Sequence, residues 1–176
     1  MTKAKWALDP AHSSVDFSVR HMMIANVKGT FNSFNAAIDA DPTDLTTANI
    51  EFAIETASVD TRNKDRDGHL VSADFFDAEN HPNMTFKATK IEKTDDGEYN
   101  VTGDLTLRGV TKPETFAVSF EGQGKDPWGN EKVGFSATGS INRSDYGLVW
   151  NAGLETGGVL VGDKVKINLQ IQAAKA

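Results

Sequence analysis

The sequence contains no cysteine, so neither disulfide bonds nor thiolate chemistry is available to this chain. It also has no run of about 20 apolar residues, the length that a membrane-spanning helix requires. The basic start, from Met1 to Lys5, is not followed by the apolar core of a signal peptide. The lack of cysteine fits a reducing compartment, and we expect a cytoplasmic protein without a membrane span.

Complete motifs for nucleotide, metal or nucleophile chemistry are missing as well. Gly122 and Gly124 begin a dinucleotide-binding fingerprint, but Pro127 stands where the third glycine is required. The sequence has neither a nucleophile elbow nor a phosphate-binding loop. The four histidines have none of the spacings that are typical of zinc sites: His12, His21, His69 and His81. We therefore predict that the protein is not an enzyme and needs no cofactor.

The composition that remains is that of one ordinary globular domain. The 176 residues are 39% hydrophobic and 24% charged, which excludes a disordered chain. A chain of this length buries roughly two-thirds of its unfolded surface, and we predict a single domain over residues 1–176. The net charge of −7 is spread along the chain and argues against a nucleic-acid partner.

Apolar residues alternate with polar ones along most of the chain, as they do in strands that bury one face. The pattern predicts eight strands, at 12–20, 27–40, 46–56, 83–93, 99–107, 116–120, 133–141 and 165–171. In the second strand the alternation shifts by one residue between Phe31 and Phe34, which predicts a β-bulge. Residues 21–26 interrupt the alternation with apolar side chains, and we predict a turn of helix there.

The segment 58–81 is the longest part of the first 140 residues without strand alternation, and it carries the densest cluster of ionisable groups. We predict a short helix with irregular ends, capped by Asp60 or Thr61. The residues expected on one helical face are Leu70, Ala73 and Asp77. The helix lies between the third and fourth predicted strands.

Short connections between most of the strands indicate antiparallel pairing in sequence order. Such strands can form a two-sheet sandwich or close into a barrel. The barrel is favoured because the strands are long and several inward positions hold small residues, which suit a sharply bent or hollow interior. These positions are Ala36, Ala48, Ala88, Gly103, Ala137 and Gly139. The predicted fold class is all-β: an eight-stranded antiparallel up-and-down, lipocalin-like barrel with one short helix.

A partial calcium-loop pattern lies inside the helical segment. Residues 63–74 place Gly68 and several oxygen-bearing side chains at the spacing of an EF-hand loop. However, Asn63 replaces the first aspartate, Asp74 replaces the final glutamate, and no apolar helix precedes the loop. A solvated charged helix is therefore favoured over a calcium site, and a polar gate for a ligand is a third interpretation.

Many short motifs, in the same order along nearly the whole chain, resemble the YceI-like family of bacterial polyisoprenoid- or lipid-binding proteins. They lie at Trp6–Pro10, His12–Ser13, Val15–His21, Val27–Phe31, Ser58–Thr61, Arg66–Leu70, Asp74–Phe76, Gly103–Thr111, Asn142–Trp150 and Val161–Val165. The resemblance implies a lipocalin-like barrel with an adjacent helix and a long apolar tunnel that holds an isoprenoid or fatty-acyl chain. It also implies frequent homodimers, and a stress-response role is sometimes attached to the family. Many members carry a signal peptide, and this chain differs from them in that respect.

The expected ligand-binding residues follow from the strand pattern and the resemblance together. We predict that ten apolar side chains line the tunnel: Phe17, Val19, Phe31, Phe34, Phe52, Ile54, Phe86, Leu105, Phe135 and Trp150. Five basic residues are candidates for contact with a lipid headgroup at the mouth: Arg20, His21, Arg66, His69 and Arg143. For each of these five, a structural ion pair is the alternative.

Three functions stay open from the sequence. The first is non-enzymatic binding, storage or transport of a long-chain isoprenoid or related amphiphilic lipid. The second is an enzyme acting on such a lipid, with His69 and Asp67 as acid and base. The third is a barrel with a filled core that acts through its surface.

Overall fold

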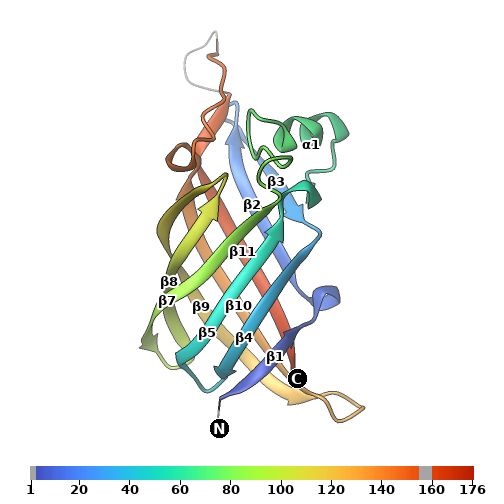
Figure 1. Cartoon of the computed structure of the whole chain (residues 1–176), viewed down its shortest axis with the longest axis vertical. Helices are drawn as coiled ribbons and strands as arrows, with labels where there is room; N and C mark the ends of the chain where they lie inside the picture. The colour runs from blue at the N-terminus through green and yellow to red at the C-terminus, as the bar shows by residue number, and fades with distance from the viewer. Residues whose placement is uncertain (1–2, 155–159) are drawn as a thin grey trace.

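A computed structural model describes residues 3–154 and 160–176. It shows a closed antiparallel β-barrel with one short helix at one end (Figure 1). The strands are β1 Ala4–Leu8, β2 Ser14–His21, β3 Ala25–Phe31, β4 Phe34–Asp41, β5 Asp44–Glu55, β6 Val59–Asp60, β7 Asn83–Asp95, β8 Glu98–Leu107, β9 Val110–Lys125, β10 Glu131–Asn142 and β11 Val161–Lys175. The helix is α1, Lys64–Val71, and 3₁₀ turns occupy Pro10–His12, Thr56–Ser58 and Arg143–Tyr146.

Three of the eight barrel strands are interrupted, which is why eleven strands form an eight-stranded barrel. β1 and β2 both pair with β11, and they are separated by the turn Pro10–His12. β3 pairs with β2, β4 pairs with β1, and β6 continues the line of β5 by pairing with β3. The pairing of β1 with β11 closes the sheet. The predicted all-β, eight-stranded antiparallel barrel is therefore confirmed.

The phase shift predicted in the second strand lies at a break between β3 and β4. Asn32 and Ser33 belong to neither strand, and both are exposed. Phe31 and Phe34 lie on either side of this break. Odd-numbered residues point inward before the break, and even-numbered residues point inward after it. A break of two residues thus has the effect on side-chain direction that was expected of a bulge.

Two elements differ from the sequence prediction. Ala4–Leu8 was not predicted as a strand, because it has only five residues and Lys5 is the one polar residue that marks its outer face. Residues 21–26 were predicted as a turn of helix, but residues 22–24 form the hairpin turn between β2 and β3, and the flanking residues belong to these strands. There, the amide of Ile24 donates to the carbonyl of His21 at 3.2 Å.

The predicted short helix is present as α1, but its ends differ from the prediction. Asn63, rather than Asp60 or Thr61, caps the helix, because its side-chain oxygen accepts from the amide of Arg66 at 3.0 Å. The helix ends at Val71, so Ala73 and Asp77 lie beyond it and do not share a helical face with Leu70. No helix in the described ranges 3–154 and 160–176 is long and apolar enough to span a bilayer.

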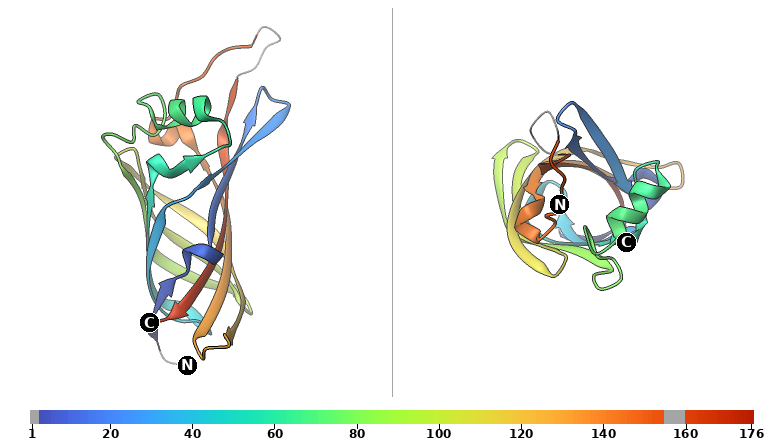
Figure 2. Two further views of the ribbon diagram at one scale, coloured as in Figure 1. Left: turned by 90° about the vertical axis from the view of Figure 1, so that its right-hand side faces the viewer. Right: turned by 90° about the horizontal axis from the view of Figure 1, so that it is seen from above.

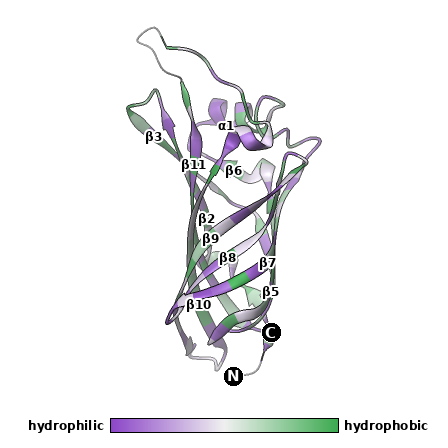
Figure 3. Ribbon diagram, turned by 90° about the vertical axis from the view of Figure 1, so that its left-hand side faces the viewer, coloured by the Kyte–Doolittle hydropathy of each residue, from purple (hydrophilic) through white to green (hydrophobic). Residues whose placement is uncertain are grey.

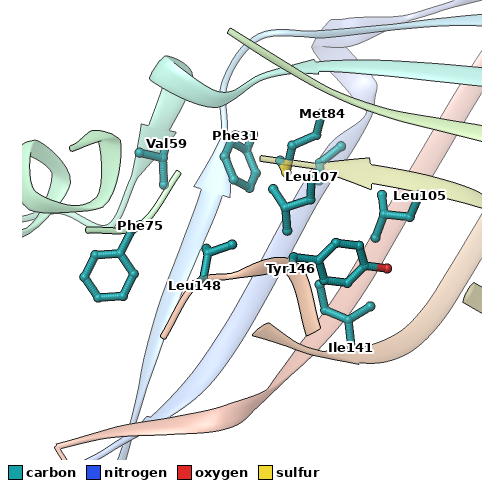
Figure 4. Close-up of a cluster of buried hydrophobic side chains, with 10 residues drawn as sticks. Phe31, Val59, Phe75, Met84, Leu105, Leu107, Ile141, Tyr146 and Leu148 are labelled. Carbon is teal, nitrogen blue, oxygen red and sulfur yellow. The ribbon is translucent and has the colours of Figure 1, made fainter. Parts of the chain in front are cut away.

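Hydrophobic and hydrophilic residues alternate along the strands, so that one set faces the barrel interior (Figure 3). Two buried clusters pack at opposite ends of this interior. The upper cluster lies near α1 and comprises Val15, Phe31, Val59, Phe75, Met84, Leu105, Leu107, Ile141, Tyr146 and Leu148 (Figure 4). The lower cluster comprises Trp6, Ala40, Leu45, Tyr99, Val101, Val133 and Ala173.

Candidate functional site

An elongated cavity of about 360 Å³ lies within the barrel. Its lining runs from Trp6 and Ala173 of the lower cluster to His69 of α1 and Val161 at the start of β11. Every strand except β6 contributes to this wall, almost entirely through apolar side chains. Ligand-binding cavities in proteins typically measure about 300–1,000 Å³ and have mostly apolar walls, so this volume is that of a ligand site.

Inward side chains of the barrel differ in how completely they are buried. Phe52 and Ile54 point inward from β5 and line the cavity, yet both are only half-buried. Trp6 in the lower cluster and Tyr146 in the upper cluster are 4% and 0% exposed. Inward side chains that stay partly accessible lack packing partners on one side, which is the property of a cavity wall and not of a filled core.

Nine of the ten side chains predicted to line a tunnel lie along the cavity: Phe17, Val19, Phe31, Phe52, Ile54, Phe86, Leu105, Phe135 and Trp150. Phe34 is not part of the wall and packs against the upper cluster. Sequence reasoning missed Phe75, Phe76 and Leu148, which reach the cavity from segments without strand alternation. The paired aromatic Phe75-Phe76, directly after the charged helix, was the available signal.

Some of the small inward residues are required by aromatic rings on the neighbouring strand. A Cβ atom at Gly139 of β10 would lie 2.5 Å from the Phe116 ring of β9. A Cβ atom at Gly29 of β3 would collide with the Phe17 ring of β2. These glycines therefore let phenyl rings lie flat against the barrel wall, which leaves the centre of the barrel open.

At the α1 end, the mouth of the cavity is bordered by aromatic rings and ionisable side chains. Nε2 of His69 lies 2.9 Å from Oδ2 of Asp74. The same imidazole meets the rings of Trp150 and Phe75 edge-on, at centroid distances of 4.6 and 5.0 Å. Because Trp150 belongs to the segment before β11 and His69 belongs to α1, this cluster joins the two elements across the mouth.

Arg143 is a buried cation that joins the residues after the last 3₁₀ turn to the start of β11. It is 5% exposed, and its guanidinium donates to four backbone carbonyls, those of Leu148, Trp150, Val161 and Gly162, at 2.7–3.2 Å. Burial lowers the pKa of Arg143, while the charge of Asp163 raises it. A structural ion pair was the alternative considered for Arg143, and hydrogen bonds to backbone carbonyls take its place.

The other four basic candidates also border the cavity, but their donors are differently engaged. Nη2 of Arg20 donates to the carbonyl of Met23 at 2.8 Å, so its charge lies on the β2–β3 hairpin. Arg66 donates to the hydroxyl and the carbonyl of Thr61 at 2.8 and 2.7 Å. The side chain of His21 makes no hydrogen bond or ion pair within the described part of the chain. His21, Arg66 and His69 thus border the same end of the cavity, where a polar headgroup would be placed.

The acid–base pair considered for an enzyme is not formed. Oδ1 of Asp67 accepts from the amide and the hydroxyl of Thr61, at 2.9 and 2.5 Å. His69 is paired with Asp74 instead. Both partners of the considered pair are therefore engaged elsewhere.

The segment 63–74 does not adopt the form of a calcium loop. It is helical from Lys64 to Val71, and its oxygen-bearing side chains bond to protein groups, as Asn63, Asp67 and Asp74 show. In the part of the chain that the structure describes, no three histidine or acidic side chains gather as a metal site would require.

One further buried polar pair belongs to the fold. The hydroxyl of Tyr146 donates to Oε1 of Glu114 at 2.8 Å inside the upper cluster. Burial is the main reason why the pKa of Tyr146 is raised above its ordinary value, and the bond to Glu114 adds to it. The phenol is therefore a hydrogen-bond donor to Glu114 within the fold.

Comparison with known proteins identifies relatives over nearly the whole chain. The sequence profile of the YceI-like domain matches residues 6–173. A UPF0312 protein of Staphylococcus epidermidis is 44% identical over 163 residues, which cover 92% of each chain. A UPF0312 protein of Staphylococcus aureus is 41% identical over 162 residues, again with 92% of each chain covered.

Solved structures share the same barrel. The Campylobacter jejuni YceI protein superposes with a TM-score of 0.77 at 37% identity, covering 89% of this chain and 90% of the other. BcnA of Burkholderia cenocepacia gives a TM-score of 0.80 at 27% identity, covering 94% and 98%. A polyisoprenoid-binding domain from Saccharophagus degradans gives 0.74 at 15% identity, covering 98% and 99%, which shows a common fold. The profile match and the staphylococcal relatives show that the chain belongs to the YceI-like family.

Proposed function

We propose that this protein binds a long-chain isoprenoid or a related amphiphilic lipid, without chemical conversion, and stores or transports it. The observation that carries the proposal is the apolar cavity of about 360 Å³ along the barrel. The structural relative from Saccharophagus degradans, which is described as a polyisoprenoid-binding domain, has the same fold and supports this ligand class.

The energetics of a chain lipid fit such a cavity. Each methylene-sized group that leaves water contributes about 0.8 kcal/mol. A dozen such groups contribute roughly 10 kcal/mol before the costs of association and ordering are subtracted. Micromolar or tighter binding therefore requires no strong polar contact, and His21, Arg66 and His69 at the mouth would serve to orient a headgroup.

An inward charge tests the cavity directly. In Phe52→Asp a carboxylate without a partner would lie in the apolar wall, and we expect binding of a prenyl or acyl chain to weaken at least about tenfold. Ala53→Asp is the matched control, because Ala53 is the next residue of β5 and is exposed on the outer face. Titration with a fluorescent acyl chain measures both variants.

A second variant blocks the cavity without adding charge. Ala137 of β10 lines the cavity and is 8% exposed, so that the ring of Ala137→Phe would occupy the space of the ligand. Thr138→Phe places the same ring on the outer face and should bind normally. If folded Phe52→Asp and Ala137→Phe both bind the probe as well as the wild type, the cavity is not the binding site.

The ligand itself is identified by native mass spectrometry of protein purified from its own host without detergent. We expect an added mass that solvent extracts as an isoprenoid or a fatty-acyl lipid. Purified protein that carries no bound lipid and does not bind added prenyl or acyl chains would refute the proposal.

A further inference from the structure

Most of the large apolar side chains that the described residues expose lie at one end of the barrel. Met22, Met23 and Ile24, at the tip of the β2–β3 hairpin, are 44%, 57% and 77% exposed. Val149, next to the cavity-lining Trp150, is 67% exposed. The hairpin projects past the barrel at the end that carries α1 (Figure 2). The exposed apolar tip is therefore adjacent to the mouth of the cavity.

The turn that presents these side chains is strained. Met22 and Met23 both have positive φ, +52° and +62°, and they are the central residues of a β-turn in which the amide of Ile24 donates to the carbonyl of His21. Positive φ at both central positions favours Asn-Gly, because a side chain with a Cβ atom costs about 1 kcal/mol or more there. The sequence carries methionine at both positions, so folding stability alone does not account for these residues.

A cationic face accompanies the apolar tip. Arg20, Lys28, Lys164 and Lys166 occupy outward positions on β2, β3 and β11, and the register places Lys28 and Lys166 on either side of Ser18. None of the four forms a salt bridge with another described residue. Four cations gathered near one hairpin stand out in a chain whose net charge is −7.

We propose that the tip of the β2–β3 hairpin inserts into an anionic membrane surface and brings the cavity mouth to the bilayer. Met22, Met23 and Ile24 would enter the interface, and the cations behind them would contact lipid phosphates. The α1 side of the mouth exposes Arg62 and Lys64 beside Asp65 and Asp74, so its charges offset one another, and the barrel docks by its hairpin side. The inference rests on the proposed function, because a chain lipid that is insoluble in water must enter the cavity from a membrane.

The turn itself provides a sharp test. Met22→Asn combined with Met23→Gly removes two apolar side chains and supplies the residues that the turn favours. We expect this variant to bind vesicles of phosphatidylcholine containing phosphatidylglycerol at least about tenfold more weakly, while its thermal stability equals or exceeds that of the wild type. Trp128→Ser is the control, because Trp128 is 82% exposed but lies in the β9–β10 hairpin at the other end of the barrel.

The charges are tested separately. Lys28→Gln combined with Lys166→Gln should lower binding to the same vesicles by about fivefold for each cation removed. Added salt should similarly weaken vesicle binding by the wild type, because at about 0.1 M salt the attraction between exposed charges is largely screened beyond about 10 Å. Lys87→Gln with Lys93→Gln, two exposed lysines of β7, is the matched control and should leave binding unchanged. Equal binding to vesicles of pure phosphatidylcholine would contradict the role of the cations.

Binding of a monomeric fluorescent acyl probe in solution separates this inference from the proposed function. The hairpin variant should bind the dissolved probe as the wild type does, but take it up from vesicles more slowly. If the wild type fails to bind the probe, the proposed function fails, whereas vesicle binding still decides the docking surface. The inference is overturned if the wild-type protein does not bind anionic vesicles, or if the hairpin variant binds them as well as the wild type does. A dimer in sedimentation that the hairpin variant loses, without vesicle binding, would assign the tip to a second copy of the chain.

Discussion

At the scale of single residues, Arg143 shows how one buried side chain can hold an irregular segment in place. Four backbone carbonyls, in the short segments 148–150 and 161–162, accept from this guanidinium. The planar fork of arginine suits several fixed acceptors at once, whereas the ammonium of lysine is a compact point charge. Arg143 thus positions Trp150 at the cavity mouth, although it was considered only as a headgroup contact or an ion-pair partner.

We expect Arg143→Met to lower the free energy of unfolding by about 3 kcal/mol, because buried carbonyls would lose their donors. Arg143→Lys should recover only part of this loss, since lysine cannot reach all four acceptors. Urea unfolding measures both variants, with Lys112→Met as an exposed control. A stability of Arg143→Met within 0.5 kcal/mol of the wild type, roughly the effect of an ordinary surface change, would contradict this role.

At the scale of elements, α1 is too short to be stable on its own. It has eight residues, contains Gly68 and buries no residue fully. Its position depends on Thr61, which is 4% exposed and bonds to both Asp67 and Arg66. The helix is therefore held by hydrogen bonds to one residue of the preceding segment, in addition to the packing of Leu70 and Val71 on the upper cluster.

Thr61→Val keeps the shape of the side chain and removes its hydroxyl. We expect backbone amides of α1 to exchange hydrogen at least about fivefold faster, because loss of one such bond costs about 1 kcal/mol or more. Hydrogen-exchange mass spectrometry measures the effect. Thr47→Val, at an exposed site of β5, is the control. Unchanged exchange in α1 would show that packing alone holds the helix.

At the scale of the whole molecule, one short piece of an interrupted strand, β1, closes the barrel. β1 pairs with β11 on one side and with β4 on the other. Trp6 of β1 is buried in the lower cluster, and its indole Nε1 donates to the carbonyl of Ala40 at 3.1 Å. This pairing leaves β1 without a free edge and closes the sheet at the lower end of the barrel.

Trp6→Ala should lower the free energy of unfolding by about 3–5 kcal/mol, the usual cost of removing a large buried aromatic ring. Trp128→Ala, the same change at a residue that is 82% exposed, should change it by less than about 0.5 kcal/mol. Urea unfolding followed by circular dichroism compares the two. Equal effects would mean that β1 is not needed to close the barrel.

The sequence by itself determined the strands and their inward faces. The period of two is a local property of an extended chain, so the side-chain directions of Phe17, Phe52 and Phe135 could be predicted without knowing any partner strand. The eight strands followed from the alternation and their antiparallel order from the connection lengths, and the family motifs agreed. The same reasoning failed for Phe34, since a residue directly after a break between strands can point inward and still lie beside the cavity.

Only the tertiary structure decided how the mouth is built. The partners of Arg143, His69 and Thr61 come from elements that sequence periodicity cannot bring together, and hydrogen bonds to backbone carbonyls leave no trace in residue type. The strand Ala4–Leu8 depends on pairing with β11, which is distant in the sequence. The tight turn at Met22 and Met23 depends on the pairing of β2 with β3 and has a strained backbone. Periodicity thus determines which residues face inward, whereas contacts distant in sequence determine whether the interior stays hollow and where it opens.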